Sequence, residues 1–338
     1  MTKIAPIALT IGEPGGIGPE LSLKVWLRRH DDGLAPFCVL APLGILENAC
    51  REHGKNVPLK VISDIAETAS VFDHALPVLA IADAESPVVT GIASASTANV
   101  VIESITKAVD LARNGAASAV VTNPIQKSAL YAAGFKHPGH TEFLAELAGP
   151  GTIPVMMLAN SKLRVVPLTI HIALSDVMNS LTPELIIEQC EITAAALQRD
   201  FGIANPRLAV AGLNPHAGED GTMGTEEQTI MAPAIATLRA KGLDVIGPMP
   251  ADTMFHEEAR TNYDVALCPY HDQALIPVKT LDFHGGVNVT LGLPFIRTSP
   301  DHGTALNIAG QGIARPDSLI AALKMAAEMA EKRLLTGA

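Results

Sequence analysis

Short apolar runs recur along this chain of 338 residues, and longer segments with helical periodicity separate them. Apolar runs without regular polar alternation are typical of strands that are buried on both faces. Strands that alternate with helices favour a parallel or mixed sheet covered by helices, so the predicted fold class is α/β. The expected strands are 4–11, 37–42, 59–63, 76–81, 117–124, 153–160, 163–171, 207–212, 263–271 and 287–296.

Four longer segments carry the signals of helices. The clearest is 181–202, where Thr182 can cap the first turn, Pro183 suits the first helical position and Gly202 ends the helix. In the segment 226–242, Pro233 predicts a kink. The other two predicted helices are 97–115 and 316–335.

The composition excludes several broad classes of protein. Hydrophobic residues make up 48% of the chain and charged residues 17%, which indicates a globular protein with a large core. A formal net charge of −11 argues against a broad surface for nucleic acid or anionic membranes. Glycine and proline interrupt the apolar stretches, so we expect no membrane span. Four cysteines are too few for a disulfide framework, and we expect reduced thiols in a cytoplasmic protein.

Three histidines follow three predicted strands. His171, His216 and His271 each stand at or just beyond the end of an apolar run. Because open α/β sheets bind ligands at the carboxyl ends of their strands, three imidazoles placed there could converge on one ion. Three histidine ligands leave a position open for catalysis and suit Zn²⁺ or Co²⁺ better than Mg²⁺. The alternative is that each histidine is an ordinary surface or hydrogen-bonding residue.

Several polar residues stand where an anion could bind. His140 and Thr141 begin a predicted helix, and helix N-termini attract anions; the alternative is that Thr141 only caps the helix. Lys279 and Arg297 are single basic residues in apolar surroundings, which suits an anionic ligand or, alternatively, a side chain that reaches the surface. Asn288 lies inside a strand-like run where asparagine is disfavoured.

Two glycine-rich segments are candidates for close contact with a ligand. In "GEPGGIGPE" (12–20) the glycine spacing does not match the dinucleotide fingerprint, so only a tight strand-to-helix turn is predicted. The second, "DHGTALNIAGQG" (301–312), offers backbone amides ahead of the last helix.

Taken together, these stretches resemble the 4-hydroxythreonine-4-phosphate dehydrogenase family over essentially the whole chain. The blocks that carry the resemblance are "GEPGGIGPE", "VVTNPIQKSAL", "GHTEF", "GLNPHAGEDGTMGTEE", "GPMPADTMF", "YHDQALIPVKTL" and "GVNVTLGLPFIRTSPDHGTALNIAG". The resemblance implies a two-domain mixed-sheet fold of the isocitrate and isopropylmalate dehydrogenase type, with the active site in an interdomain cleft. It implies that residues 1–125 with 280–338 bind NAD, and that residues 126–279 bind metal and substrate and form the dimer.

The resemblance also implies roles for individual residues. The family's ligands for one divalent metal per subunit (zinc, cobalt or magnesium) map onto His171, His216 and His271. Its substrate-binding residues map onto His140, Thr141, Lys279, Asn288 and Arg297. The segment "HGTALNIAGQGIARP" is similar to the cofactor loop of isopropylmalate and isocitrate dehydrogenases, which implies that His302, Gly303, Thr304 and Asn307 bind NAD or NADP. Lys279 is a candidate base, and Asp252 and Asp272 are candidates to orient the metal ligands; the alternative for Asp272 is a solvated loop carboxylate.

The implied activity is the NAD-dependent and metal-dependent oxidation of 4-phosphooxy-L-threonine in pyridoxine 5′-phosphate biosynthesis. The product, 2-amino-3-oxo-4-phosphooxybutanoate, loses carbon dioxide to give 3-amino-2-oxopropyl phosphate. The family is homodimeric, with active sites at the subunit interface. Three alternatives stay open: a dehydrogenase of D-threonate or D-erythronate 4-phosphate, a three-histidine metal-dependent hydrolase or aldolase, and a non-catalytic binding protein.

Overall fold

The computed structural model describes residues 4–137 and 139–337, and the chain divides into two compact units. Unit 1 comprises Met1–Pro154 and Leu293–Leu334, and unit 2 comprises Val155–Gly292 and Leu335–Ala338. The boundaries therefore fall after Pro154 and after Gly292, later in the chain than positions 125 and 279 expected from the sequence. As a consequence, the segment that carries His140 packs with unit 1.

Unit 1 is built on a parallel sheet with the strand order β3-β4-β2-β1-β5-β12. Its inner strands are buried along their whole length, which explains why their sequences are continuously apolar. The strands are β1 (Ile7–Thr10), β2 (Phe37–Ala41), β3 (Leu59–Ile62), β4 (Leu76–Ala80), β5 (Ala119–Thr122) and β12 (Arg297–Pro300).

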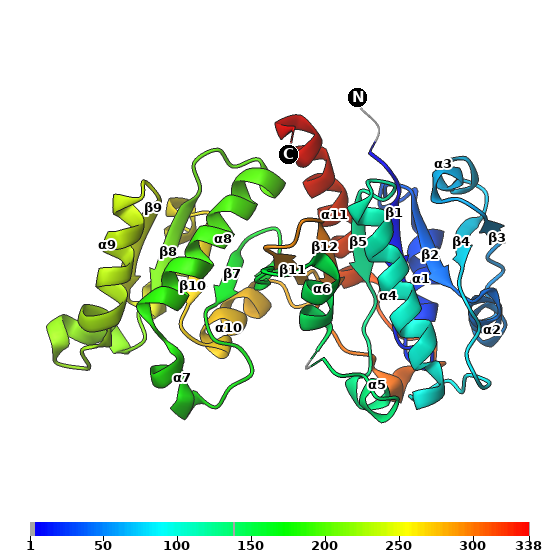
Figure 1. The fold of residues 1–338 in the computed structure, drawn as a ribbon, viewed down its shortest axis with the longest axis horizontal. Coiled ribbons are helices and arrows are strands. Elements are labelled where there is room, and N and C mark those ends of the chain that lie inside the picture. The colour runs from blue at the N-terminus through cyan, green and yellow to red at the C-terminus, as the bar shows by residue number, and fades with distance from the viewer. Residues whose placement is uncertain (1–3, 138, 338) are drawn as a thin grey trace. The chain divides into compact units, whose positions relative to one another are not determined.

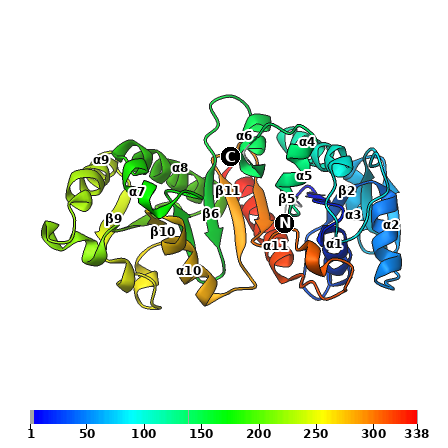
Figure 2. The same ribbon diagram turned by 90° about the horizontal axis from the view of Figure 1, so that it is seen from below.

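Helices cover both faces of this sheet (Figures 1 and 2). On one face, α4 (Ala98–Arg113) and α6 (His140–Ala148) pack on a core that includes Ala8, Leu40 and Val120. On the other face lie α1 (Gly18–Leu27) and α11 (Asp317–Thr336). The remaining helices are α2 (Leu43–Glu52), α3 (Thr68–Val71) and α5 (Lys127–Ala132), with 3-10 turns η1 (Ile65–Glu67), η2 (Ala95–Thr97) and η7 (Leu306–Ile308).

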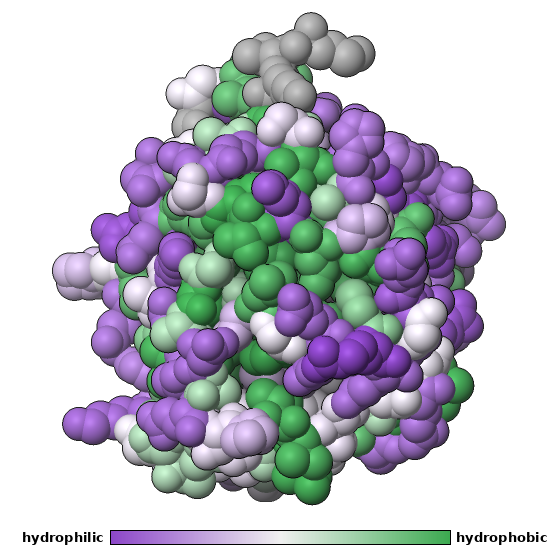
Figure 3. Space-filling model, turned by 90° about the vertical axis from the view of Figure 1, so that its right-hand side faces the viewer, coloured by the Kyte–Doolittle hydropathy of each residue, from purple (hydrophilic) through white to green (hydrophobic). Residues whose placement is uncertain are grey.

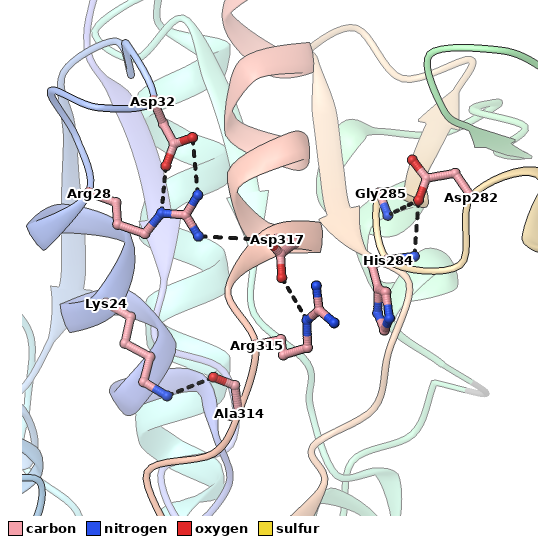
Figure 4. Close-up of polar contacts among 9 residues, drawn as sticks. All are labelled: Lys24, Arg28, Asp32, Asp282, His284, Gly285, Ala314, Arg315 and Asp317. Atoms are coloured by element: carbon pink, nitrogen blue, oxygen red, sulfur yellow. Dashed lines mark hydrogen bonds and ion pairs between the residues drawn. The ribbon is translucent and has the colours of Figure 1, made fainter.

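Polar contacts join α1 to α11 and to the loop before it (Figure 4). The Lys24 ammonium donates to the Ala314 carbonyl oxygen at 2.6 Å. It also donates to the Gly312 carbonyl oxygen at 2.8 Å. The Arg28 guanidinium lies 2.8 Å from the Asp32 carboxylate and 3.6 Å from that of Asp317. Exposed ion pairs of this kind stabilise a fold by less than about 1 kcal/mol. The loop before α11 is held by the two hydrogen bonds from Lys24.

The edge of unit 1 at β3 is short. Figure 3 shows this side of the molecule, where apolar residues gather near the middle and hydrophilic residues surround them. The edge strand β3 has four residues and exposes Lys60 and Val61. A short edge strand with an exposed lysine discourages the addition of a foreign strand.

Unit 2 contains a mixed sheet with the strand order β11-β6-β7-β10-β8-β9. The pairs β11–β6 and β6–β7 are antiparallel, and the pairs from β7 to β9 are parallel. The α/β mixed-sheet fold expected from the sequence is thereby confirmed. The strands are β6 (Val155–Ala159), β7 (Arg164–Pro167), β8 (Arg207–Ala211), β9 (Asp244–Met249), β10 (Val265–Cys268) and β11 (Val287–Leu291).

Helix α10 (His271–Leu281) covers one face of the unit 2 sheet, and α8 (Pro183–Phe201) and α9 (Ala232–Ala240) cover the other (Figure 2). The predicted ends of α8 are confirmed: the Thr182 hydroxyl accepts from Leu185 N at 3.2 Å, and Gly202 is left-handed with φ 67°. The remaining elements are α7 (Leu174–Ser180) and the turns η3 (Pro215–Gly221), η4 (Glu227–Met231), η5 (Ala251–Thr253) and η6 (Ala259–Asn262).

The predicted helix 226–242 is instead two elements. A π-helical turn, η4, precedes α9, and Pro233 lies in the first turn of α9 just beyond this junction. The proline thus marks a change of helix type, because its ring cannot continue the preceding hydrogen-bond pattern. None of the helices in the described part of the chain is both long enough and apolar enough to cross a membrane.

Candidate functional site

The carboxyl ends of three adjacent strands carry the three predicted histidines to one edge of the unit 2 sheet. Strand β10 pairs in parallel with β7 on one side and with β8 on the other. His171 follows β7, His216 follows β8 and His271 follows β10. The three histidines, each about one strand-helix-strand unit apart in the sequence, therefore follow three strands that lie side by side, with β10 in the middle.

Two of these imidazoles line one cavity. The ring centroids of His171 and His271 lie 5.6 Å apart. The cavity has a volume of about 260 Å³. Its lining combines imidazole, hydroxyl and carboxylate groups with apolar side chains from α7; the lining residues are Thr169, His171, Ile172, Leu174, Val177, Tyr270, His271 and Asp272.

The His271 ring is oriented by its neighbour in the sequence. Nδ1 of His271 lies 2.7 Å from Oδ1 of Asp272, and His271 is the first residue of α10. A carboxylate on one ring nitrogen fixes the tautomer and leaves Nε2 as the nitrogen that can bind a ligand. The structure thus makes the contact that the candidate role of Asp272 requires.

His171 and His216 both stand in the left-handed region of backbone space. Their φ angles are 49° and 53°, and both residues are exposed. A left-handed backbone costs a residue with a side chain about 1–2 kcal/mol, so the surrounding structure must hold these conformations in place. Strain of this kind is concentrated at functional sites.

The chemistry of these donors fits a divalent metal of the zinc or cobalt type. Imidazole nitrogens are the preferred ligands of such ions, and a carboxylate on the far nitrogen raises their basicity. Among the residues that the structure describes, however, no group of three or more His, Cys, Asp or Glu side chains comes together in an arrangement that could hold a metal. One chain therefore brings two of the three expected ligands into one cavity.

A separate cluster of polar groups in unit 1 suits an anion. Arg297, the first residue of β12, is 4% exposed, and its Nη2 donates to Thr122 Oγ1 at 2.7 Å. The same nitrogen lies 3.5 Å from Nδ1 of His140. Burial lowers the pKa of Arg297 to about 10, so the guanidinium is still charged at neutral pH.

His140 opens α6 and is held neutral. Its pKa lies well below the usual value because the ring is buried and, to a smaller extent, because Arg297 and Lys127 are nearby cations. Its Nε2 is buried and has no hydrogen-bond partner among the described residues. The N-cap position of α6 belongs to Gly139, so Thr141 lies in the first turn and is not the cap. A helix start, a buried guanidinium and an unpartnered ring nitrogen together favour an anionic ligand.

The other predicted residues of unit 2 lie outside the histidine cavity. Lys279 is in the last turn of α10, about 12 Å along the helix from His271, and its Nζ lies 5.8 Å from the ring centroid of Phe283. Asn288 is half-buried on β11, opposite Leu158 of β6. Asp252 is exposed in η5.

The two glycine-rich segments of unit 1 lie against each other. Ile17 N donates to the carbonyl of Thr304 at 3.1 Å, and Thr304 Oγ1 donates to Gln126 Oε1 at 2.9 Å. A Cβ on Gly16 would stand 2.9 Å from the Thr304 carbonyl oxygen, so this position requires glycine.

Within the second segment, the predicted cofactor residues differ in how far they are exposed. Burial lowers the pKa of His302, and its Nε2 has no hydrogen-bond partner among the described residues. Gly303 and Asn307 are exposed, whereas Thr304 is buried. The loop therefore offers both exposed backbone and a buried ring nitrogen to a ligand.

Sequence reasoning missed several residues that support these sites. Thr122, at the end of β5, holds Arg297, and the same strand-end argument that identified the histidines could have found it. Lys127 shifts the His140 ring toward its neutral form, but nothing local in the sequence indicates this. Glu227, which contacts the segment before His216, also lacked a sequence signal.

Comparison with known proteins shows the family to which the chain belongs. The family model for the pyridoxal phosphate biosynthetic protein PdxA matches residues 33–326. The chain is 54% identical to the 4-hydroxythreonine-4-phosphate dehydrogenase of Methylorubrum populi over 97% of its length and 95% of the relative's. It is also 54% identical to that of Caulobacter vibrioides, over 97% and 98%.

A solved structure of a protein with the same name is also similar to this chain. The crystal structure of 4-hydroxythreonine-4-phosphate dehydrogenase from Klebsiella pneumoniae is 39% identical and superimposes with a TM-score of 0.87, covering 96% of this chain and 99% of that one. These likenesses extend over nearly the whole chain, as the ordered sequence blocks predicted. The chain belongs to the PdxA family of pyridoxal phosphate biosynthetic proteins.

Proposed function

We propose that this protein oxidises 4-phosphooxy-L-threonine at its C3 hydroxyl with a nicotinamide cofactor, and that the resulting 3-oxo acid loses carbon dioxide. The observation that carries the proposal is the buried Arg297, held by Thr122 beside the unpartnered Nε2 of His140. A phosphorylated amino acid supplies the anionic groups that such a site binds. Family membership identifies the substrate class, because the relatives above bear the name of this activity.

In unit 1, the residues act by binding and orienting. The Arg297 guanidinium presents its N–H donors to a phosphate or carboxylate, and Thr122 fixes its direction. His140 is kept neutral by its surroundings, so it offers a hydrogen bond without adding charge. Thr141 is the further substrate contact that we propose in this unit.

In unit 2, His171, His216 and His271 would hold one divalent metal ion, which supplies electrophilic stabilisation of negative charge on the substrate oxygen. Asp272 supports this role by fixing the tautomer of His271. We further propose Lys279 and Asn288 as substrate contacts and Lys279 as the base that takes the alcohol proton. Asp252 is the second acidic residue proposed to orient the ligands.

The cofactor contacts that we propose are His302, Gly303, Thr304 and Asn307, with NAD or NADP as the hydride acceptor. The support is local: the Thr304 side chain and carbonyl are both fixed by hydrogen bonds, and the adjacent Gly303 backbone is exposed. Tight contact with Gly16 holds the loop close to the first glycine-rich turn. Such a loop can present backbone amides to a pyrophosphate.

We also propose that the protein acts as a homodimer and that the histidine cavity lies at its interface. The helices that contribute to this cavity expose apolar side chains: Leu174, which lines the cavity, is 69% exposed and Met178 56% on α7, and Ile276 is 64% exposed on α10. A second copy seated on this face would bury them and could complete a ligand set that one chain does not assemble among its described residues. Sedimentation velocity should give a dimer that Leu174→Asp weakens; a monomer for the unaltered chain would contradict the proposal.

The substrate assignment is tested by cofactor reduction. NAD and NADP are each supplied with 4-phosphooxy-L-threonine, D-threonate 4-phosphate or D-erythronate 4-phosphate, and the absorbance of the reduced nicotinamide is followed. We expect the highest kcat/KM with 4-phosphooxy-L-threonine. A higher value with either sugar acid phosphate would transfer the assignment to that substrate. Failure to reduce either cofactor with all three would reject the dehydrogenase in favour of a metal-dependent hydrolase or aldolase.

A further inference from the structure

The loop that carries His216 has an unusual backbone. Five consecutive residues, 216–220, have φ angles of 53°, 52°, 79°, 40° and 54°. Only one of the five, Gly218, is a glycine, so the other four adopt a conformation that side chains disfavour. Something outside the loop must hold this conformation.

The carboxylate of Glu227 contacts the segment that leads into the loop. Glu227 is 3% exposed, and its Oε1 accepts the backbone N–H of Asn214 at 2.7 Å. Its Oε2 accepts from the side-chain amide of Asn214 at 3.0 Å. The neighbouring Glu226 also accepts from this amide, at 2.8 Å, but no bond joins it to the Asn214 backbone N–H. Glu227 therefore fixes both the main chain and the side chain of a residue two positions before His216.

Two glycines allow the carboxylate to stand inside the loop. A Cβ on Gly218 would come 2.7 Å from Glu227 Oε2, and one on Gly212 would come 3.3 Å from Oε1. The backbone on both sides of His216 thus wraps closely around a single buried carboxylate. Glu227 itself begins the π-helical turn η4, a form that is frequent at functional sites.

The same segment is joined to the strand end that carries His271. The Gln273 side-chain amide, from the first turn of α10, donates to the carbonyl of Gly212 at 2.8 Å. This hydrogen bond holds the segment after β8 next to the start of α10, which carries His271 and Asp272.

We propose that Glu227 is a positioning residue for metal binding, which acts by holding the His216 loop in its left-handed conformation. The inference depends on the metal site of the proposed function. The hydrogen bonds of the carboxylate go to Asn214 and not to His216 itself. The carboxylate sets the position of His216 through Asn214 and the two glycines, as residues that support the metal ligands do at other metal centres.

The test is the affinity of Glu227→Gln for Co²⁺, measured by calorimetry on the full-length protein. Glutamine keeps the size of the side chain but replaces one acceptor by a donor that faces Asn214. We expect the dissociation constant for Co²⁺ to rise about 10–100-fold, which is typical when such supporting groups are lost. The matched control is Glu226→Gln, which removes a contact to the same asparagine side chain; its dissociation constant should stay within about twofold of the original.

The unfolding temperature of each metal-free variant, compared with that of the unaltered protein, shows whether the variant is folded. Weaker Co²⁺ binding by a folded variant then indicates positioning and not a general loss of structure. A folded Glu227→Gln variant with unchanged Co²⁺ affinity would overturn the inference. If that variant does not fold, Glu227→Asp retracts the carboxylate by one methylene and should weaken Co²⁺ binding in the same direction; unchanged affinity there has the same meaning. Absence of Co²⁺ binding by the unaltered protein would instead reject the proposed metal site, and the inference with it.

Discussion

At the scale of single residues, the unit 1 site depends on polar groups that are buried before any ligand binds. Arg297 is almost completely buried, and burial of a guanidinium disfavours its charge, as the lowered pKa shows. Thr122 supplies one compensating hydrogen bond. An anion bound to Arg297 stabilises the charge of the buried guanidinium. Binding of the anion therefore offsets the free energy that removal of the guanidinium from water costs.

Replacement of Arg297 by lysine tests this coupling. Lysine keeps the positive charge but loses the planar fork that can bond Thr122 and an anion together. Loss of a hydrogen bond to a charged group corresponds to about 1.5–3 kcal/mol, so we expect kcat/KM for the phosphorylated substrate to fall about 10–100-fold.

Arg113→Lys is the matched control, because Arg113 donates to the Leu147 carbonyl at an exposed position of the same unit. Its kcat/KM should be unchanged. A loss of less than about twofold in Arg297→Lys would show that the guanidinium does not bind the substrate.

At the scale of secondary structure, most elements could be predicted because their signals are local. All ten predicted apolar runs contain strands. Most of these strands are buried, and a buried strand can be recognised from the apolar residues of its own sequence. The ends of α8 were equally local, with Thr182, Pro183 and Gly202 in the expected positions.

The two missed strands show where local signals fail. Strand β12 reads "RTSP", which is polar, yet all four residues are buried. Its Thr298 hydroxyl is satisfied by the Ala322 carbonyl of α11, a partner that the sequence near Thr298 does not indicate. In β9, "DVIGPM", a glycine and a proline interrupt the apolar run.

In the candidate site, too, local features could be predicted from the sequence and contacts between distant residues could not. The position of the histidines after strands is a local feature, and the structure places all three at one edge of the unit 2 sheet, as the sequence predicted. Contact between Asp272 and His271 was also foreseeable, because the residues are adjacent. The role of Glu227 was not, because it arises only when η4 folds back on the segment before His216. Nor could the sequence show that residues 216–220 are left-handed.

At the scale of the whole molecule, the two units carry different parts of the proposed chemistry. Unit 1 holds the buried arginine, the neutral His140 and the glycine-rich loops, whereas unit 2 holds the three histidines just beyond the ends of parallel strands. We propose above all that the histidines of unit 2 make this dehydrogenase dependent on a divalent metal.

The most direct test is removal and return of the metal. The protein is treated with a chelator, dialysed, and assayed for reduction of NAD or NADP by 4-phosphooxy-L-threonine before and after Zn²⁺, Co²⁺ or Mg²⁺ is added. We predict that chelation abolishes turnover, that at least one ion restores it, and that no ion restores it in His216→Ala. Full turnover by the metal-free protein, or full restoration in His216→Ala, would contradict the account.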